Sequence, residues 1–333
     1  ARRHGYARRG SGGPARTGER GSSVSDTVLT NLADYRNGFP HELFTELRAQ
    51  GAVHRHVPVA IRSDLPAEGF WSVVRHAEVQ QANRNWEAFT ATESVSIYRA
   101  PAMGGLTLVS MDPPDHARLR RLISAGFTPR MIGLLEDHIA ARCERILDDA
   151  AAMGTCDFVA DIAYQLPMHV IADILGIPEA DRPWVFRRTA MFLEALDPDS
   201  PVTDDDHRTV QRELFEYAVE LTKEKRRAPC DDAWSLIANA EIADDDGTTH
   251  RLDGFELEMF FVILAIAGSE TTRNALSQGL LALDDHPEQV EELRGDRSLL
   301  TSATDEIIRW ASPVLYFGRT ATRDIELGGV NIA

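Results

Sequence analysis

The sequence predicts a mainly α-helical fold with small β-sheets. Between residues 112 and 310, apolar side chains recur at the spacing of amphipathic helices. Strand-like alternation of apolar and polar residues occurs only near the two ends of the chain, at 52–74 and 314–333. The chain has 333 residues, 43% of them hydrophobic and 26% charged, so it contains enough apolar material for a large core.

The N-terminal part combines a polar segment with short helices and strands. Residues 1–25 contain six arginines and six glycines with almost no apolar side chains, so we expect a disordered tail ahead of a folded domain at 26–333. Residues 90–111 have no periodicity and are expected to form a long loop with a functional role. The other expected elements are helices at 40–51 and 76–89 and a strand hairpin at 52–59 and 69–74.

Helices dominate the remainder of the chain. Asp112 and Asp115 flank two prolines, which is typical of a helix start, and Asp253 is expected to cap a long helix that Pro287 ends. A final hairpin is expected at 314–333, with its turn at two glycines. The expected helices cover residues 130–152, 161–175, 180–196, 202–228, 231–240, 254–285, 287–294 and 299–310.

The composition excludes several classes of function. Asp and Glu (52) outnumber Lys and Arg (35), and the net charge of −17 argues against nucleic acid as a partner. Cys143, Cys156 and Cys230 have no paired spacing, so neither a disulfide scaffold nor a cysteine zinc module is expected, and a reducing, cytoplasmic compartment is favoured. The longest apolar run, 259–268, is about half as long as a membrane span requires.

A polar cluster interrupts the long helix expected at 254–285. Gly268 is followed by a serine, Glu270, Thr271 and a second threonine, which are poor helix formers, and a threonine hydroxyl can bond to the carbonyl one turn back. A groove opened beside a carboxylate and a hydroxyl would suit proton delivery. A buried helix with a packing glycine also explains these residues.

Three further groups place charge in unusual settings. His116 and Arg120 lie one helical turn apart and present donors suited to carboxylates, although a solvated helix face has the same spacing. Glu306 and Arg309 form an i,i+3 pair of a kind that is common on surfaces. Arg319 stands on an otherwise apolar strand, where it needs an anion unless it lies at the strand edge.

No single motif decides the function, but their order along the chain is specific. The segments 111–129, 267–272 and 319–329, together with the pair Glu306-x-x-Arg309, resemble four motifs of the cytochrome P450 enzymes. The resemblance covers residues 32–333 and implies the cytochrome P450 fold and a haem-dependent monooxygenase of the soluble bacterial type. Two segments look most like the actinobacterial branch that hydroxylates steroid side chains and methyl-branched lipids, namely 267–274 and 305–313.

The resemblance also implies a cofactor and redox partners. His116, Arg120 and Arg319 would hold the propionates of haem b, whose iron activates oxygen. Electrons would come from a small ferredoxin and its reductase, and Arg118 and Arg121 could help to dock that acidic partner.

Catalytic and substrate-binding roles follow in the same way. The resemblance implies that Glu270 and Thr271 manage protons, and that Glu306 and Arg309 form a buried structural pair. The irregular segment 90–111 and the long helix offer apolar side chains for a small apolar substrate of the sterol, terpenoid or lipid class. The expected pocket residues are Val109, Ile263 and Ala267.

One family element has no counterpart in this sequence. The family's haem-ligand loop, Phe-x-x-Gly-x-x-x-Cys-x-Gly, lies some tens of residues beyond the position of Arg319, whereas the sequence ends at Ala333, 14 residues after Arg319. None of the three cysteines fits that loop, so we expect no axial metal ligand in this chain. We therefore expect a fragment, truncated before the loop and inactive by itself.

Other functions remain open at this stage. A haem-free helical binding protein could retain the scaffold, but it would have no use for the acid–alcohol pair Glu270 and Thr271. A peroxide-using relative would tend to replace that pair. A hydroxylase of a polyketide or another secondary metabolite is compatible with every motif.

Overall fold

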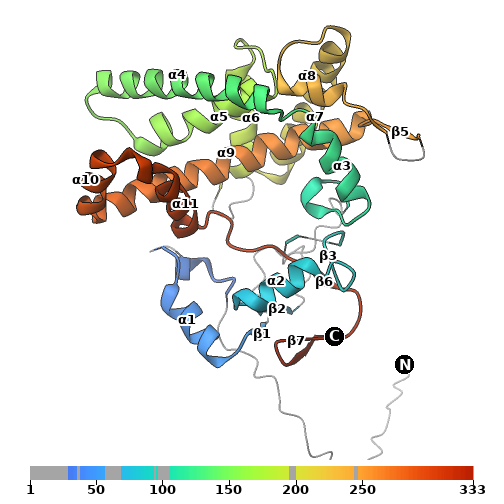
Figure 1. The fold of residues 1–333 in the computed structure, drawn as a ribbon, viewed down its shortest axis with the longest axis vertical. Helices are drawn as coiled ribbons and strands as arrows, with labels where there is room; N and C mark the ends of the chain where they lie inside the picture. Colours follow the sequence, from blue (N-terminus) through green and yellow to red (C-terminus); the bar gives the residue numbers. More distant parts are fainter. Residues whose placement is uncertain are drawn as a thin grey trace, which may run out of the picture. The chain divides into compact units, whose positions relative to one another are not determined.

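The computed structural model describes residues 29–35, 38–56, 69–93, 95–96, 105–194, 200–243 and 247–332. It is mostly helical with two-stranded sheets, as the sequence predicts (Figure 1). Backbone contacts divide the chain into a small unit (Ala1–Ala60, Ala67–Ala82 and Asp324–Ala333) and a helical unit (Ile61–Pro66 and Asn83–Arg323). The tail expected at 1–25 lies outside the described residues, as do the strand residues expected at 57–59.

Two antiparallel hairpins and two helices make up the described part of the small unit. The two strands of the final hairpin meet at Gly328 and Gly329, whose φ angles of +58° and +80° favour glycine. The hairpin predicted at 314–333 begins only at Ile325, so it is shorter than expected. The elements are η1 (Leu32–Tyr35), α1 (His41–Gln50), β1 (Val53–His56), β2 (Phe70–Val73), α2 (His76–Arg84), β7 (Ile325–Leu327) and β8 (Val330–Ile332).

The two histidines of β1 contribute to packing inside the small unit. His54 Nε2 lies 2.9 Å from the Leu47 carbonyl oxygen, and His56 Nε2 lies 2.7 Å from Ser72 Oγ. Both imidazoles are buried, and among the described residues they belong to no group that could hold a metal ion.

Helix α2 ends earlier than the sequence predicts. The Asn85 carbonyl accepts the N–H groups of Ala88 and Phe89, and this turn stops the helix at Arg84. The next residues form β3 (Phe89–Thr90), which pairs with β6 (Thr320–Ala321). Arg319 therefore immediately precedes β6 and does not lie within a long strand as expected.

The helical unit contains most of the chain, and its helices begin close to the expected positions. Thr128, Thr203 and Asp253 each cap a helix by accepting a backbone N–H with the side-chain oxygen. The elements are η3 (Leu108–Ser110), α3 (Asp115–Ser124), α4 (Pro129–Met153), η4 (Phe158–Ala163), α5 (Gln165–Ile174), α6 (Arg182–Glu194), α7 (Asp204–Arg227), α8 (Ala233–Ala238), β4 (Ile242–Ala243), β5 (Thr249–His250), α9 (Gly254–Asp285), α10 (Pro287–Gly295), η5 (Arg297–Leu299) and α11 (Leu300–Ala311).

Helix α9 runs through the middle of the helical unit (Figure 1) and packs against α5, α6, α7 and α11. Its apolar run is buried: Leu257 and Phe261 are fully inaccessible, and Phe261 lies edge-on to the buried Trp234 of α8. A helix with apolar side chains on most faces needs neighbours on most sides, which explains its central position. No helix in the described ranges has both the length and the hydropathy of a membrane span.

Gly268 lies where α9 packs closely against α5. A Cβ atom at this position would overlap the Cδ1 atom of Ile171 and lie 3.0 Å from its Cγ1 atom. Gly133 of α4, by contrast, has open space around it. The absence of a side chain at Gly268 thus lets α5 pack directly on α9.

We predict opposite effects on stability for alanine at these two glycines. Gly268→Ala should lower the free energy of unfolding by about 1–3 kcal/mol because the new methyl group overpacks the buried Ile171. Gly133→Ala should raise it by about 0.5–1 kcal/mol, since alanine favours the helix and meets no neighbour. Urea unfolding measures both, and a stabilised Gly268→Ala variant would contradict the packing described.

Candidate active site

The polar cluster of α9 does not break the helix. Helix α9 is continuous from Gly254 to Asp285, so the groove expected beside Gly268 is not present. The hydroxyl groups instead bond within the helix: Thr271 Oγ1 donates to the Ala267 carbonyl oxygen at 2.8 Å, and Ser269 Oγ to that of Ala265 at 2.8 Å. Ser269 is buried, whereas Thr271 is only partly covered.

One stripe of α9 faces away from the core. Ala267 is exposed, and Thr271, one turn later, is half-buried. Ile263, one turn earlier, is half-buried against the core. These three residues share a helix face at i, i+4 and i+8, as the substrate-pocket prediction requires. Val109 is 40% exposed at η3.

The carboxylate of Glu270 is held by two neighbours on the same helix. It forms an ion pair with Arg273, and Asn274 Nδ2 donates to the same oxygen at 3.2 Å. Both members of the ion pair are about 30% exposed. Arg273 and Asn274 were not predicted as site residues, although their i+3 and i+4 spacing from Glu270 would have indicated the contacts.

Two of the predicted cationic groups have no partner in the described part of the chain. His116 and Arg120 lie on α3, half-buried and exposed respectively, without a hydrogen bond or ion pair to a described residue from their side chains. Arg118, on another face of α3, forms an ion pair with Glu256 at the start of α9. The hydrogen bond that Arg118 donates to Glu256 raises the pKa of Arg118. Arg118 therefore joins α3 to α9, which differs from its expected role in docking a redox partner.

Arg319 is a half-buried arginine that lacks a carboxylate partner among the described residues. Its Nη1 donates to the Gly318 carbonyl oxygen at 2.7 Å. Burial lowers the pKa of Arg319, and the charge of Asp112 partly offsets that effect. Since a partly desolvated guanidinium gains most from an anionic ligand, Arg319 has the character expected of an anion-binding residue. No hydrogen bond joins Thr271 to His116, Arg120 or Arg319 in the described ranges.

Glu306 and Arg309 pair as the sequence predicts, but they are not buried. Arg309 donates to both carboxylate oxygens of Glu306 at 2.6 Å, and this bond lowers the pKa of Glu306. Their side chains are 58% and 67% exposed. Helix α11 packs on α9 through Ile307, which contacts Gly279, so the face that carries the pair looks outward. The expected buried pair is therefore wrong for this structure.

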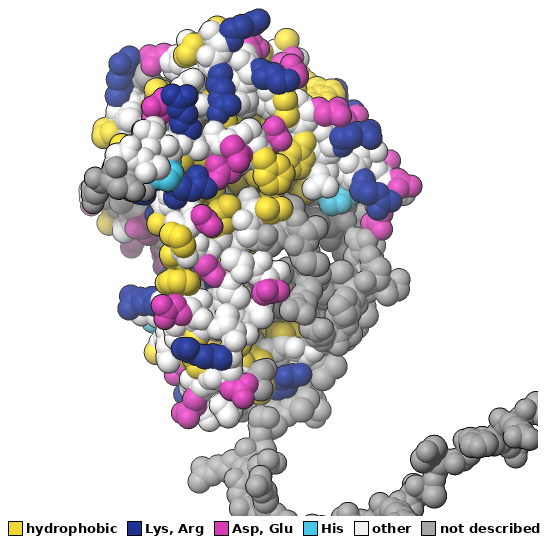
Figure 2. Space-filling model, turned by 90° about the vertical axis from the view of Figure 1, so that its right-hand side faces the viewer, with side chains coloured by type: hydrophobic (Ala, Val, Ile, Leu, Met, Phe, Trp, Pro, Cys, Tyr) yellow, Lys and Arg dark blue, Asp and Glu magenta, His cyan; other side chains and the backbone are white. Residues whose placement is uncertain are grey.

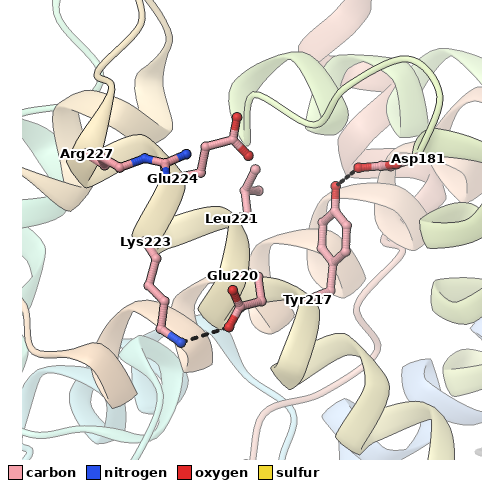
Figure 3. Close-up of a pocket in the computed structure, with 7 residues that line it drawn as sticks. All are labelled: Asp181, Tyr217, Glu220, Leu221, Lys223, Glu224 and Arg227. Atoms are coloured by element: carbon pink, nitrogen blue, oxygen red, sulfur yellow. Dashed lines mark hydrogen bonds and ion pairs between the residues drawn. The ribbon is translucent and has the colours of Figure 1, made fainter.

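One pocket in the described residues lies along α7 and has a volume of about 430 Å³. It is lined mainly by charged side chains, and the Tyr217 hydroxyl donates to Asp181 at 2.9 Å (Figure 3). This lining does not suit an apolar substrate. On the face drawn in Figure 2, basic side chains lie among acidic and apolar ones.

The cysteines lie away from the open stripe of α9. Cys143 is on α4, which packs against α5 and η4, and burial raises the pKa of its thiol. Cys156 lies between α4 and η4, and Cys230 is exposed ahead of α8. None of the three is on α3 or α9 or next to β6, where the predicted catalytic and propionate-binding residues lie.

Comparisons with known proteins show which family the chain resembles. The cytochrome P450 family matches residues 185–333. Putative cytochrome P450 126 of Mycobacterium tuberculosis is 38% identical over 322 residues, which cover 92% of this chain and 75% of that protein.

The chain belongs to the cytochrome P450 family.

Two further P450 relatives support the assignment. A steroid C26-monooxygenase of Mycolicibacterium smegmatis is 36% identical over 88% of this chain and 68% of its own length. A solved structure of a Mycobacterium marinum cytochrome P450 in complex with pseudoionone has a TM-score of 0.76 at 37% identity, covering 87% of this chain and 72% of that one. These findings confirm the predicted fold, family, actinobacterial branch and monooxygenase class.

The residues described fit the propionate side of a haem group. Arg319 is half-buried and has no carboxylate partner in the described ranges. The side chains of His116 and Arg120 form no hydrogen bond or ion pair there either. All three side chains could therefore bind an anionic ligand. The open stripe of α9 offers Thr271 on the same unit. The helices α3 and α9 and the segment around Arg319 contain no cysteine that could serve as the thiolate ligand of the family.

We predict that the 333-residue chain, loaded with haem, reduced and exposed to carbon monoxide, shows no thiolate-type absorption band. The reason is that its cysteines lie on α4, after α4 and ahead of α8. The Mycobacterium tuberculosis relative, treated in the same way, provides the positive control. A thiolate-type band from this chain would show that one of the three cysteines reaches the iron, and serine variants would identify it.

Proposed function

We propose that the chain provides the oxygen-activating and propionate-binding part of a haem-thiolate monooxygenase. Such an enzyme inserts one oxygen atom of O₂ into a C–H bond of an apolar substrate. The observation that supports this most is the open stripe of α9, where Thr271 follows Ala267 by one turn and Glu270 lies next in sequence. A purely structural helix would have no need of a partly exposed acid–alcohol pair.

In this proposal the cations of the helical unit hold haem b. Arg319 binds a propionate from its half-buried position, and His116 and Arg120 bind from α3, because charge-assisted bonds to carboxylates are strong and directional. Haem bound through a cysteine thiolate would supply oxygen activation, because electron donation by the thiolate favours O–O cleavage. The cysteine for that ligand would lie outside the residues described here.

Thr271 and Glu270 would then move protons. The reaction consumes two electrons and two protons for each substrate hydroxylated, and the second oxygen atom leaves as water. The Thr271 hydroxyl donates to the helix, which leaves its lone pairs free to accept from water on the open face. Glu270, held by Arg273 and Asn274, would exchange protons with solvent through its partly exposed carboxylate.

The electrons would come from a ferredoxin and its reductase, in the cytoplasm that the unpaired cysteines favour. An acidic ferredoxin would be drawn to basic residues of α3. Arg118, which also pairs with Glu256, and Arg121 are the candidates for this contact.

An apolar substrate of the sterol, terpenoid or lipid class is the preferred assignment. The side chains on the stripe, Ile263 and Ala267, are apolar, and curated relatives include steroid C26-monooxygenases and a methyl-branched lipid omega-hydroxylase of Mycobacterium bovis at 33% identity. A polyketide substrate is the alternative, since a cytochrome P450 of the Bacillus subtilis bacillaene polyketide synthase has a TM-score of 0.75 at 27% identity.

We predict that Thr271→Ala uncouples the reaction. The test uses an extended chain, in which residues 1–333 continue into the family's haem-ligand loop and following helix from the Mycobacterium tuberculosis relative. Thr271→Ala should retain substrate binding but release hydrogen peroxide in place of product, while Glu270→Gln should slow turnover by up to about 10²–10⁴-fold, as loss of a proton-transfer group does.

Thr272→Ala is the matched control, because that side chain is exposed on the neighbouring face. Thr271→Ser keeps the hydroxyl and should restore coupling. Equal product per oxygen consumed in Thr271→Ala and in the unaltered extended chain would contradict the assigned role.

We predict that sterols or long-chain terpenoids shift the haem of the extended chain to high spin at micromolar concentration. Ala267→Leu should weaken this shift by about tenfold or more, because the larger side chain occupies the open stripe, whereas Ala151→Leu on exposed α4 should not. Optical titration measures both effects. A shift with a polar polyketide and none with sterols, terpenoids or branched fatty acids would overturn the lipid assignment.

A further inference from the structure

Asp112, just ahead of α3, attaches the start of this helix to β3. Its Oδ1 accepts the backbone N–H of Ala91 at 3.1 Å, and its Oδ2 accepts the hydroxyl of Thr90. Thr90 and Ala91 are buried, so the carboxylate makes these bonds in a protected place. Because Asp112 accepts a hydrogen bond at each carboxyl oxygen, the orientation of its side chain is fixed.

Each side of this attachment carries a predicted propionate-binding group. On one side, the Asp112 carbonyl oxygen accepts the backbone N–H of His116 at 3.0 Å, so Asp112 begins the turn that carries His116 and, one turn later, Arg120. On the other side, Thr90 stands opposite Thr320 in the β3–β6 pair, directly after Arg319. Asp112 therefore lies at the junction between the two sources of positive charge.

We infer that Asp112 is a positioning residue that sets the spacing between the α3 donors and Arg319 so that together they bind the two haem propionates. This inference rests on the proposed function, in which these groups hold haem. Asp112 acts without occupying the site, because no ion pair joins its carboxylate to Arg319 in the described ranges, which leaves the guanidinium available to an anion.

The charge of Asp112 supports the same role. Burial alone would disfavour the charged form of Arg319, and the neighbouring carboxylate partly opposes this effect on its pKa. Asp115, three residues later, provides a comparison: it is exposed in the first turn of α3 and bonds to no described side chain. Asp112 and Asp115 thus lie close together in the sequence, but only Asp112 bonds to Thr90 and Ala91.

Haem and haem dimethyl ester separate a positioning role from a purely structural one. The ester has the same ring but lacks carboxylates, so the ratio of its dissociation constant to that of haem measures the contribution of the propionates. Quenching of the fluorescence of the five tryptophans in the 333-residue chain reports both constants. The variants are Asp112→Ala, Asp112→Asn and the control Asp115→Ala, each also unfolded in urea without haem.

We expect the unaltered chain to prefer haem over the ester by more than about tenfold. Asp112→Ala should lower this preference by about 10–100-fold, as loss of a group that orients ligand-binding residues typically does. The ester should bind Asp112→Ala as well as it binds the unaltered chain. Asp112→Asn, which keeps an acceptor for the Ala91 N–H, should restore part of the preference, and Asp115→Ala should match the unaltered chain.

Two results would overturn the inference, and they have different meanings. If the unaltered chain does not discriminate between haem and the ester, the proposed propionate set is wrong and the inference falls with it. If the unaltered chain discriminates but Asp112→Ala does so equally well, or weakens both ligands equally, only the role of Asp112 is wrong. Should Asp112→Ala fail to fold, an unchanged preference in both Asp112→Asn and Thr90→Val would reject the role.

Discussion

The burial of α9 is the constraint on which the rest of this structure depends. Its apolar run needs neighbours on most sides, and α5, α7 and α11 provide them, with Trp234 of α8 closing the core against Phe261. Gly268 permits the close contact with α5. Because the core uses the other faces of the helix, the stripe with Ala267 and Thr271 remains open for chemistry.

Charged contacts organise the surroundings of that stripe. Arg118 joins α3 to the first turn of α9 through Glu256, and Asp112 attaches the start of α3 to the β3–β6 pair. Arg118, Glu256 and Asp112 thus hold α3 in place. The side chains of His116 and Arg120, on the same helix, remain without a partner in the described ranges. In physical terms the helical unit contains cationic and donor side chains that lack an anionic partner in the described ranges, and the two carboxylates of a flat cofactor such as haem would satisfy them.

The sequence predicted the helices well because their signals are local. Caps such as Thr128, Thr203 and Asp253 act within one turn, and the apolar spacing is carried by neighbouring residues. The pairing of β3 with β6 joins segments some 230 residues apart, and no local pattern could reveal it. The exposure of Glu306 and Arg309 was mispredicted for a similar reason, since i,i+3 spacing predicts the bond but not what covers it. The candidate site came from the order of four motifs, and its supporting residues Asp112 and Glu256 required the structure.

Hydrogen–deuterium exchange of the 333-residue chain with and without haem tests the central claim most directly, namely that the open stripe of α9 and the neighbouring cations form the haem site. Haem should slow exchange in α3, in the 318–321 segment and around Thr271, where ligand contacts suppress local opening. Helix α7, beside the charged hollow of Figure 3, should be unaffected. Protection confined to α4 or α7, with none in α3 or around Arg319, would contradict the account.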